Sequence, residues 1–184
     1  LSDILKRDEV TIVQNWIDRQ LAAVGHRSDR ISRAELTDQS RRFLSLLKES
    51  VQSGSTDIRS PGWTNARQML DELSASRAQQ GFSPLETASF IFSLKEVLFE
   101  ALQKVPAKDA AAMGVRLWDT GDLLDKLGLY TTEIYQRSRE QLIVRQQQEL
   151  MELSTPVVTL WQGVLALPVI GTLDSARTQV VMEN

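Results

Sequence analysis

The chain has 184 residues, of which 42% are hydrophobic and 24% are charged, a globular composition that excludes a disordered or collagen-like chain. Its net charge of -3 gives no broad attraction for nucleic acid or for an anionic membrane. Cysteine is absent, which rules out disulfides, thiolate metal sites and cysteine nucleophiles. Charges interrupt the first 21 residues, so no secretion signal is expected there, and no apolar run reaches the ~20 residues of a membrane span. A cytoplasmic location is the simplest expectation.

The first two thirds of the chain show helical spacing throughout. Apolar residues recur every three to four positions over residues 3–24, which predicts one helix ended by Gly25. Ser32 and Glu35 have the spacing of a capping box, with Ile31 and Leu36 placed as a hydrophobic staple. The later start and stop signals predict helices between Ser32 and Gly54, between Pro61 and Gly81, and over residues 85–105.

A fifth helix is expected to begin near Lys108 and to change character at Thr131. Residues 133–152 are rich in Gln, Glu and Arg and contain neither Gly nor Pro. A helix of this composition buries little of itself, so it either bridges solvent or pairs with a copy of itself. We favour a short parallel pairing in a dimer, although the apolar heptad stripe is imperfect.

The periodicity changes again after Ser154-Thr155-Pro156. Two β-rich runs, at residues 157–161 and 164–170, flank Gln162-Gly163, which is a hairpin signal. Asp174 is placed to cap a helix that begins at Ser175. A lone hairpin with a helix stub is marginally stable, so this unit is expected to continue or to borrow surface from a partner.

The run from Leu153 to Arg177 resembles the opening of a STAS domain of the RsbR type, found in stressosome scaffold proteins. Four features occur in order: the Ser-Thr-Pro entry, the Trp-Gln-Gly turn, the Leu-Pro-Val-Ile-Gly strand end and the Asp-Ser-Ala-Arg helix start. Residues 1–105 resemble, more loosely, the helical N-terminal domain of RsbR-like co-antagonists. The resemblance implies a mainly α chain with three parts: a helical sensory bundle over 1–130, for which a globin-like arrangement is one option, a linker helix over 131–153 and the truncated start of an α/β STAS domain over 154–184.

This family implies a regulated scaffold and sensor with no enzymatic activity. Its members form homodimers through the N-terminal domain and the linker helix, and assemble with RsbS-like STAS proteins and an RsbT-like switch kinase. The resemblance implies phosphorylation of Ser175, with Thr172 ranked lower, supported by Asp174 and Arg177. Free N–H groups in the first turn of a helix favour a phosphate there, and Arg177 could add a charge-assisted hydrogen bond. The alternative is that Ser175 is simply a residue favoured at helix starts.

The sequence gives weaker support for a catalytic, metal or cofactor site. His26 is the single histidine, which excludes catalytic triads and multi-histidine metal sites. As an alternative function, His26 could ligate haem in a gas or redox sensor, although a solvated loop histidine is favoured, and no cofactor is expected. Paired carboxylates such as Asp71-Glu72 are expected on an exposed helix stretch without a catalytic role. Six aromatic residues are expected in the core rather than in a ligand pocket: Trp16, Trp63, Phe90, Phe92, Phe99 and Trp118.

Overall fold

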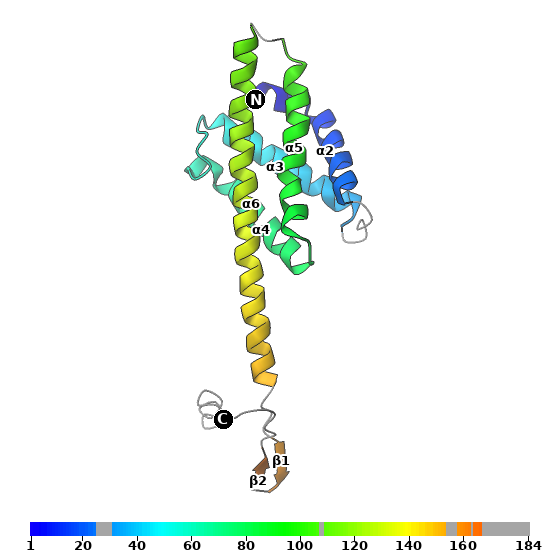
Figure 1. Ribbon diagram of the computed structural model, residues 1–184, viewed down its shortest axis with the longest axis vertical. Helices are drawn as coiled ribbons and strands as arrows, with labels where there is room; N and C mark the ends of the chain where they lie inside the picture. Colours follow the sequence, from blue (N-terminus) through cyan, green and yellow to red (C-terminus); the bar gives the residue numbers. More distant parts are fainter. Residues whose placement is uncertain (25–30, 107–108, 154–157, 163, 167–184) are drawn as a thin grey trace. The chain divides into compact units, whose positions relative to one another are not determined.

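The computed structural model describes residues 1–24, 31–106, 109–153, 158–162 and 164–166. The chain divides into two compact units, Leu1–Arg139 and Glu140–Asn184, and each is described by itself. The elements follow in chain order (Figure 1): α1 Ser2–Arg7, α2 Glu9–Val24, α3 Arg33–Gln52, the 3-10 turn η2 Pro61–Trp63, α4 Thr64–Gln79, α5 Pro84–Gln103, α6 Ala110–Leu153, β1 Val158–Trp161 and β2 Val164–Ala166.

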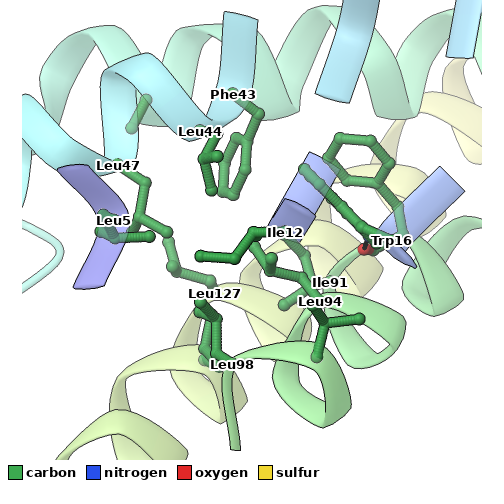
Figure 2. Close-up of a cluster of buried hydrophobic side chains, with 14 of the residues drawn as sticks. Leu5, Ile12, Trp16, Phe43, Leu44, Leu47, Ile91, Leu94, Leu98 and Leu127 are labelled. Carbon is green, nitrogen blue, oxygen red and sulfur yellow. Dashed lines mark hydrogen bonds between the residues drawn. The ribbon is translucent and has the colours of Figure 1, made fainter. Parts of the chain in front are cut away.

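The first unit is a bundle of helices around one main core. α5 and the first part of α6 run beside each other in opposite directions, and α3 crosses them at a steep angle (Figure 1). Side chains from α1, α2, α3, α5 and α6 point toward one another in this core (Figure 2). The residues labelled there are Leu5, Ile12, Trp16, Phe43, Leu44, Leu47, Ile91, Leu94, Leu98 and Leu127, all at most 2% exposed. The expected helical bundle is therefore confirmed.

The expectation of a single helix over residues 3–24 was wrong, because the chain breaks at Asp8. This residue leaves the helical region, with φ -111° and ψ 18°, and its N–H still bonds to the carbonyl of Ile4. α2 then begins at Glu9, and the Ile12 N–H bonds to the Asp8 carbonyl. Both short α1, through Leu5, and α2 bury apolar residues in the same core.

The predicted start signals of α3 and α5 have different outcomes. At α5 the Ser83 hydroxyl accepts from the Glu86 N–H while the Glu86 carboxylate accepts from the Ser83 N–H, which is a complete capping box. At α3 the Ser32 hydroxyl accepts from the Glu35 N–H, but the Glu35 carboxylate accepts from Gln39. The predicted box at α3 therefore has only its first half among the hydrogen bonds of the described residues.

The staple residues of α3 and two glycines behave as the sequence predicted. Ile31 and Leu36 pack together with Phe82 in a second, smaller cluster. Gly54 and Gly81 follow α3 and α4 with φ of 81° and 75°, a backbone region that favours glycine. These two residues therefore end their helices as expected.

The fifth helix and the expected linker are one element, α6, which continues from Ala110 to Leu153 without a break. In the second unit, β1 and β2 pair antiparallel with Val158 opposite Ala166, which confirms a hairpin at Gln162. A register shift between Thr159 and Trp161 marks a bulge. Residues 167–170 of the predicted second strand and the helix after Asp174 lie outside the described residues. The domain boundaries at 130 and 153 stay a prediction.

Candidate functional site

The residues for which the sequence predicted chemistry are not among those the structure describes. The phosphoacceptor candidates Ser175 and Thr172, their supporting residues Asp174 and Arg177, and the haem-ligand candidate His26 all lie outside the described ranges. Their roles stay predictions. The candidate site is therefore α6, the helix for which the sequence predicted the signal relay.

The first part of α6 is held in the core, and burial ends at one residue. Leu124 and Leu127 are fully buried, and so is Thr131 one turn later. Tyr135, at 5% exposure, is the last buried residue of α6 among those whose burial is described. Residues 136–150 are exposed or half-buried, as their Gln-, Glu- and Arg-rich composition predicted. Tyr135 therefore marks the point where α6 leaves the core.

Three hydrogen bonds hold α6 immediately before and at this point, and we call them the exit cluster. Each joins α6 to α4 or to the loop between α4 and α5, more than 50 residues earlier in the chain. They are Tyr130 Oη to Asp71 Oδ1 at 2.7 Å, Ser74 Oγ to the Thr131 carbonyl at 3.3 Å, and Tyr135 Oη to the Phe82 carbonyl. The Asp71 carboxylate accepts a hydrogen bond from Tyr130, so the expectation that it lies on an exposed stretch of helix was wrong.

Within the exit cluster, the pKa of Tyr130 departs from its ordinary value. Burial raises the pKa of its hydroxyl to about 12, and the hydrogen bond to the Asp71 carboxylate acts in the same direction. The hydroxyl therefore stays protonated at neutral pH and donates a charge-assisted hydrogen bond to Asp71. This bond fixes which side of α6 faces α4.

A buried arginine lies beside the exit cluster, at the end of α4. Arg77 is 4% exposed, and its guanidinium lies 5.4 Å from the ring centre of Phe82 and 5.3 Å from that of Phe90. Its Nη1 donates to the Glu86 carbonyl at 3.2 Å, while its Nε has no partner among the described residues. Burial lowers the pKa of Arg77 to about 10. Arg77 thus connects the end of α4 to the first turn of α5.

Of the six aromatic residues expected in the core, three are buried, two are exposed and Phe99 is half-buried. Trp16, Phe43 and Phe90 pack with ring centres 4.7–6.1 Å apart, and the Trp16 indole donates to the Phe90 carbonyl at 2.8 Å. Trp63 is also fully buried, which confirms the core assignment for Trp16, Trp63 and Phe90. The same assignment was wrong for Trp118, which is 78% exposed, and for Phe92, which is 38% exposed.

The exposed aromatics lie on α5 and α6, which expose further apolar side chains beside them. Val115 and Leu129 of α6 are also exposed, at 60% and 69%. Trp118 borders a shallow hollow of about 570 Å³, whose lining includes Phe99, Gly114 and Gly121. Lys95 of α5 crosses this surface and pairs with Asp125 of α6 at 2.7 Å. We call the surface formed by Phe92, Val115, Trp118 and Leu129 the outer face.

No group of three or more His, Asp or Glu side chains within the described ranges is placed to hold a metal ion. Among the helices that the structure describes, none has the length and apolarity to cross a bilayer.

These features define a class: a helical domain whose last helix is fixed in the core and then continues as a polar helix. A protein family described as the RsbT co-antagonist protein rsbRD N-terminal domain matches residues 10–150, and the chain belongs to this family. It is also similar to the RsbT co-antagonist protein RsbRA of Bacillus subtilis (strain 168), with 22% identity over 157 residues. That alignment covers 82% of this chain and 53% of RsbRA, so the chain spans about half the length of this curated relative.

The family match confirms the looser of the two resemblances found in the sequence, that of residues 1–105 to a co-antagonist N-terminal domain. The match also continues through the polar part of α6 to residue 150. The resemblance of residues 154–184 to a STAS domain stays a prediction.

Proposed function

We propose that this chain is the sensory and relay part of a stressosome scaffold protein. In this role the helical domain receives a signal, α6 transmits it, and a STAS domain that begins near Ser154 is the output. The observation that carries the proposal is the continuity of α6, which has Leu124 and Leu127 in the core and polar residues from 136 onward within one helix. Membership of the co-antagonist family supports the same assignment.

The exit cluster gives α6 a defined rotational position at the edge of the core. A helix transmits a rotation or a shift along its length when its backbone hydrogen bonds are continuous, and α6 contains no proline. A signal that alters the contacts of Tyr130 or Tyr135 would then change the orientation of the helix beyond residue 135. The output proposed is phosphorylation of the STAS part by an RsbT-like kinase, at Ser175 first and Thr172 second.

The proposal also includes the protein partners of this chain. A second copy of the chain would pair through the N-terminal domain and α6, and RsbS-like proteins would join the STAS parts. The relative's name, RsbT co-antagonist, supports an RsbT-like protein as the partner that this assembly controls. The resemblance of the sequence to the RsbR family implies that this partner is a switch kinase. The haem-sensor alternative depends on His26 and is not favoured by any feature of the described residues.

Phosphorylation mapping tests the output. The chain, an RsbS-like protein and an RsbT-like kinase are incubated with ATP, and phosphate is located by mass spectrometry. We expect label on Ser175 that disappears in Ser175→Ala, with Thr172→Ala as the matched control. Absence of label from every hydroxyl after residue 153 would remove the kinase relay from the proposal.

The relay itself is tested by insertions between Arg139 and Glu140. Seven added residues change the helical phase by only ~20°, whereas five change it by roughly 140°. We expect the seven-residue insertion to keep the signal dependence of phosphorylation and the five-residue insertion to alter it. Equal behaviour of both variants would show that α6 does not act as a continuous rod.

A further inference from the structure

A pocket of about 220 Å³ lies in the first unit, where the connection from α3 to α4 runs beside α6 (Figure 1). Its walls come from the end of α3, the loop that follows, η2 and α6, and its apolar part includes Val51, Trp63 and Leu123. At ~30 Å³ for each water molecule, the space equals about seven waters. A metabolite of roughly seven to ten non-hydrogen atoms therefore fits it.

Four residues of α6 form one wall of this pocket. Arg116, Asp119, Thr120 and Leu123 follow one another at intervals of three, one and three, the spacing that places side chains on one face of a helix. Thr120 and Leu123 are buried, at 3% and 4% exposure, whereas Arg116 and Asp119 are exposed. The wall is thus closed toward the core and carries two opposite charges toward solvent.

The polar side chains of this wall have no partner in the part of the chain that the structure describes. No hydrogen bond or ion pair joins the side chain of Arg116 or Asp119 to another described residue or to each other. The same holds for the hydroxyl of Thr120, whereas the hydroxyls of Thr131 and Thr132 on the same helix donate to carbonyls four residues earlier. Because a buried hydroxyl normally has a hydrogen-bond partner, a polar ligand is expected beside Thr120.

The opposite wall is held in place by its own contacts. The Trp63 indole donates to the Ser55 carbonyl at 2.9 Å, and the Asp57 N–H donates to the Ser55 hydroxyl at 3.2 Å. A β-carbon at Gly62 would lie 2.5 Å from Oγ of Ser53, so η2 packs directly against the end of α3. A wall that is ordered in advance loses less conformational freedom when a ligand binds.

We propose that this pocket binds an α-amino acid with an apolar side chain, and that its occupancy is the signal that α6 transmits. The Arg116 guanidinium binds the α-carboxylate, the Asp119 carboxylate binds the α-ammonium, and the apolar side chain packs on Leu123 and Trp63. A zwitterion satisfies both charged residues at once, whereas a simple carboxylate or amine would leave one of them without a partner. The binding stands on the pocket alone, and the signalling role rests on the proposed function.

The position of the pocket on α6 suits an input to the relay. Leu123 belongs to the main core and lies seven residues before Tyr130, which is about two helical turns. A ligand held by residues 116–123 therefore contacts the same helix that the exit cluster orients. Any difference in its affinity between two positions of α6 would shift the balance between them.

Calorimetric titration of the chain with leucine tests the binding. Two analogues each lack one of the charges: 4-methylpentanoate has no ammonium group and 3-methylbutylamine has no carboxylate. We expect saturable binding of leucine and at least tenfold weaker binding of both analogues, since each loses a charge-assisted hydrogen bond.

Variants of the two charged residues assign the contacts. We expect Arg116→Gln and Asp119→Asn each to weaken leucine binding at least tenfold. Asp119→Asn should bind leucine no better than 4-methylpentanoate, and Arg116→Gln should bind it no better than 3-methylbutylamine. Both residues are exposed, so the thermal midpoint without leucine should stay unchanged and show that folding is intact. The matched control is Arg139→Gln, an exposed arginine of α6 outside the pocket, which should leave the affinity unchanged.

Three results would overturn the inference: no saturable binding of leucine below ~10 mM, equal affinity for leucine and 4-methylpentanoate, or leucine binding that neither pocket variant weakens. The signalling role is measured in the kinase assay, where leucine should change the rate of Ser175 labelling in the unmodified chain but not in Arg116→Gln. Labelling that leucine does not alter would overturn that role and leave the kinase relay standing. Absence of all labelling would remove the relay, while calorimetry would still decide the binding.

Discussion

Tyr130 of α6 donates a 2.7 Å hydrogen bond to the Asp71 carboxylate of α4, across 59 residues of sequence. The bond lies at the last part of α6 that the core still holds, five residues before Tyr135. A contact in this place affects both the stability of the bundle and the orientation in which α6 continues. The two effects can be measured separately.

Removing the Tyr130 hydroxyl should destabilise the first unit by about 1 kcal/mol, since a partly exposed hydrogen bond to a charged acceptor is lost while the ring keeps its packing. Urea unfolding of Tyr130→Phe, Asp71→Ala and the double variant gives the coupling between the two residues. We expect the double variant to lose less free energy of unfolding than the two single variants lose together. The difference should roughly equal the contribution of the hydrogen bond. Additive losses would mean that the contact contributes no stability.

Alkaline pH should weaken the fold through the same residue. The pKa of Tyr130 is about 12 in the folded chain against an ordinary value of 10.0, so between these values the unfolded chain loses the proton that the folded chain keeps. The stability that this residue contributes is complete below pH ~10 and is lost as the pH rises through ~12. The free energy of unfolding should therefore fall more between about pH 9 and about pH 11 in the unmodified chain than in Tyr130→Phe.

A spectroscopic measurement supplies the control for this pH effect. The chain has two tyrosines, so in Tyr135→Phe the ultraviolet absorption of tyrosinate reports Tyr130 alone. We expect a titration midpoint clearly above 10.0, moving back toward that value in Asp71→Ala. A midpoint at 10.0 in the folded chain would contradict the burial of this hydroxyl.

Gly128→Ala should destabilise the chain, although alanine favours a helix. The new β-carbon would lie 2.7 Å from Cζ of Phe92, and displacing the ring costs more than the ~1 kcal/mol of helix propensity that alanine adds. We expect a net loss of about 1 kcal/mol in urea unfolding. Adding Phe92→Leu, whose shorter side chain leaves room, should restore most of this loss.

The matched comparison for Gly128 is Gly114→Ala. No described atom of the chain is within 4 Å of the new β-carbon there, so the substitution should stabilise by up to ~1 kcal/mol. If both glycines respond alike, the close approach of α5 to α6 at Gly128 is not what requires glycine.

Local signals in the sequence predicted the helices well because their causes are local. The Ser83-Glu86 capping box, Gly54 and Gly81 act within a few residues, and each ends or begins a helix as predicted. The break at Asp8 was missed because Leu5, Ile12 and Trp16 keep helical spacing across it, so their periodicity is that of one continuous helix.

The exit cluster and the outer face were beyond sequence analysis for a different reason. Periodicity shows which apolar side chains share one face of a helix, but not which of them other helices cover. Trp118 was therefore assigned to the core, although it is exposed. The partnership of Tyr130 with Asp71 joins two helices that only the tertiary arrangement brings together. Gly121 and Gly128, seven residues apart within one helix, were a signal in the sequence that could have indicated a close approach of another element to α6.

Arg77 provides a test of whether its charge or its shape matters to the bundle. The guanidinium is buried between the rings of Phe82 and Phe90, its Nε lacks a partner among the described residues, and its lowered pKa of about 10 reflects the cost of burying the charge. Methionine has a similar length, packs well against aromatic rings and carries no charge. We therefore expect the free energy of unfolding of Arg77→Met to lie within ~1 kcal/mol of the unmodified value, whereas Arg77→Ala, which leaves a cavity, should lose ~2–4 kcal/mol. Equal losses in the two variants would instead assign the stabilisation to the charged group, and with it to the bond that Arg77 donates to the Glu86 carbonyl.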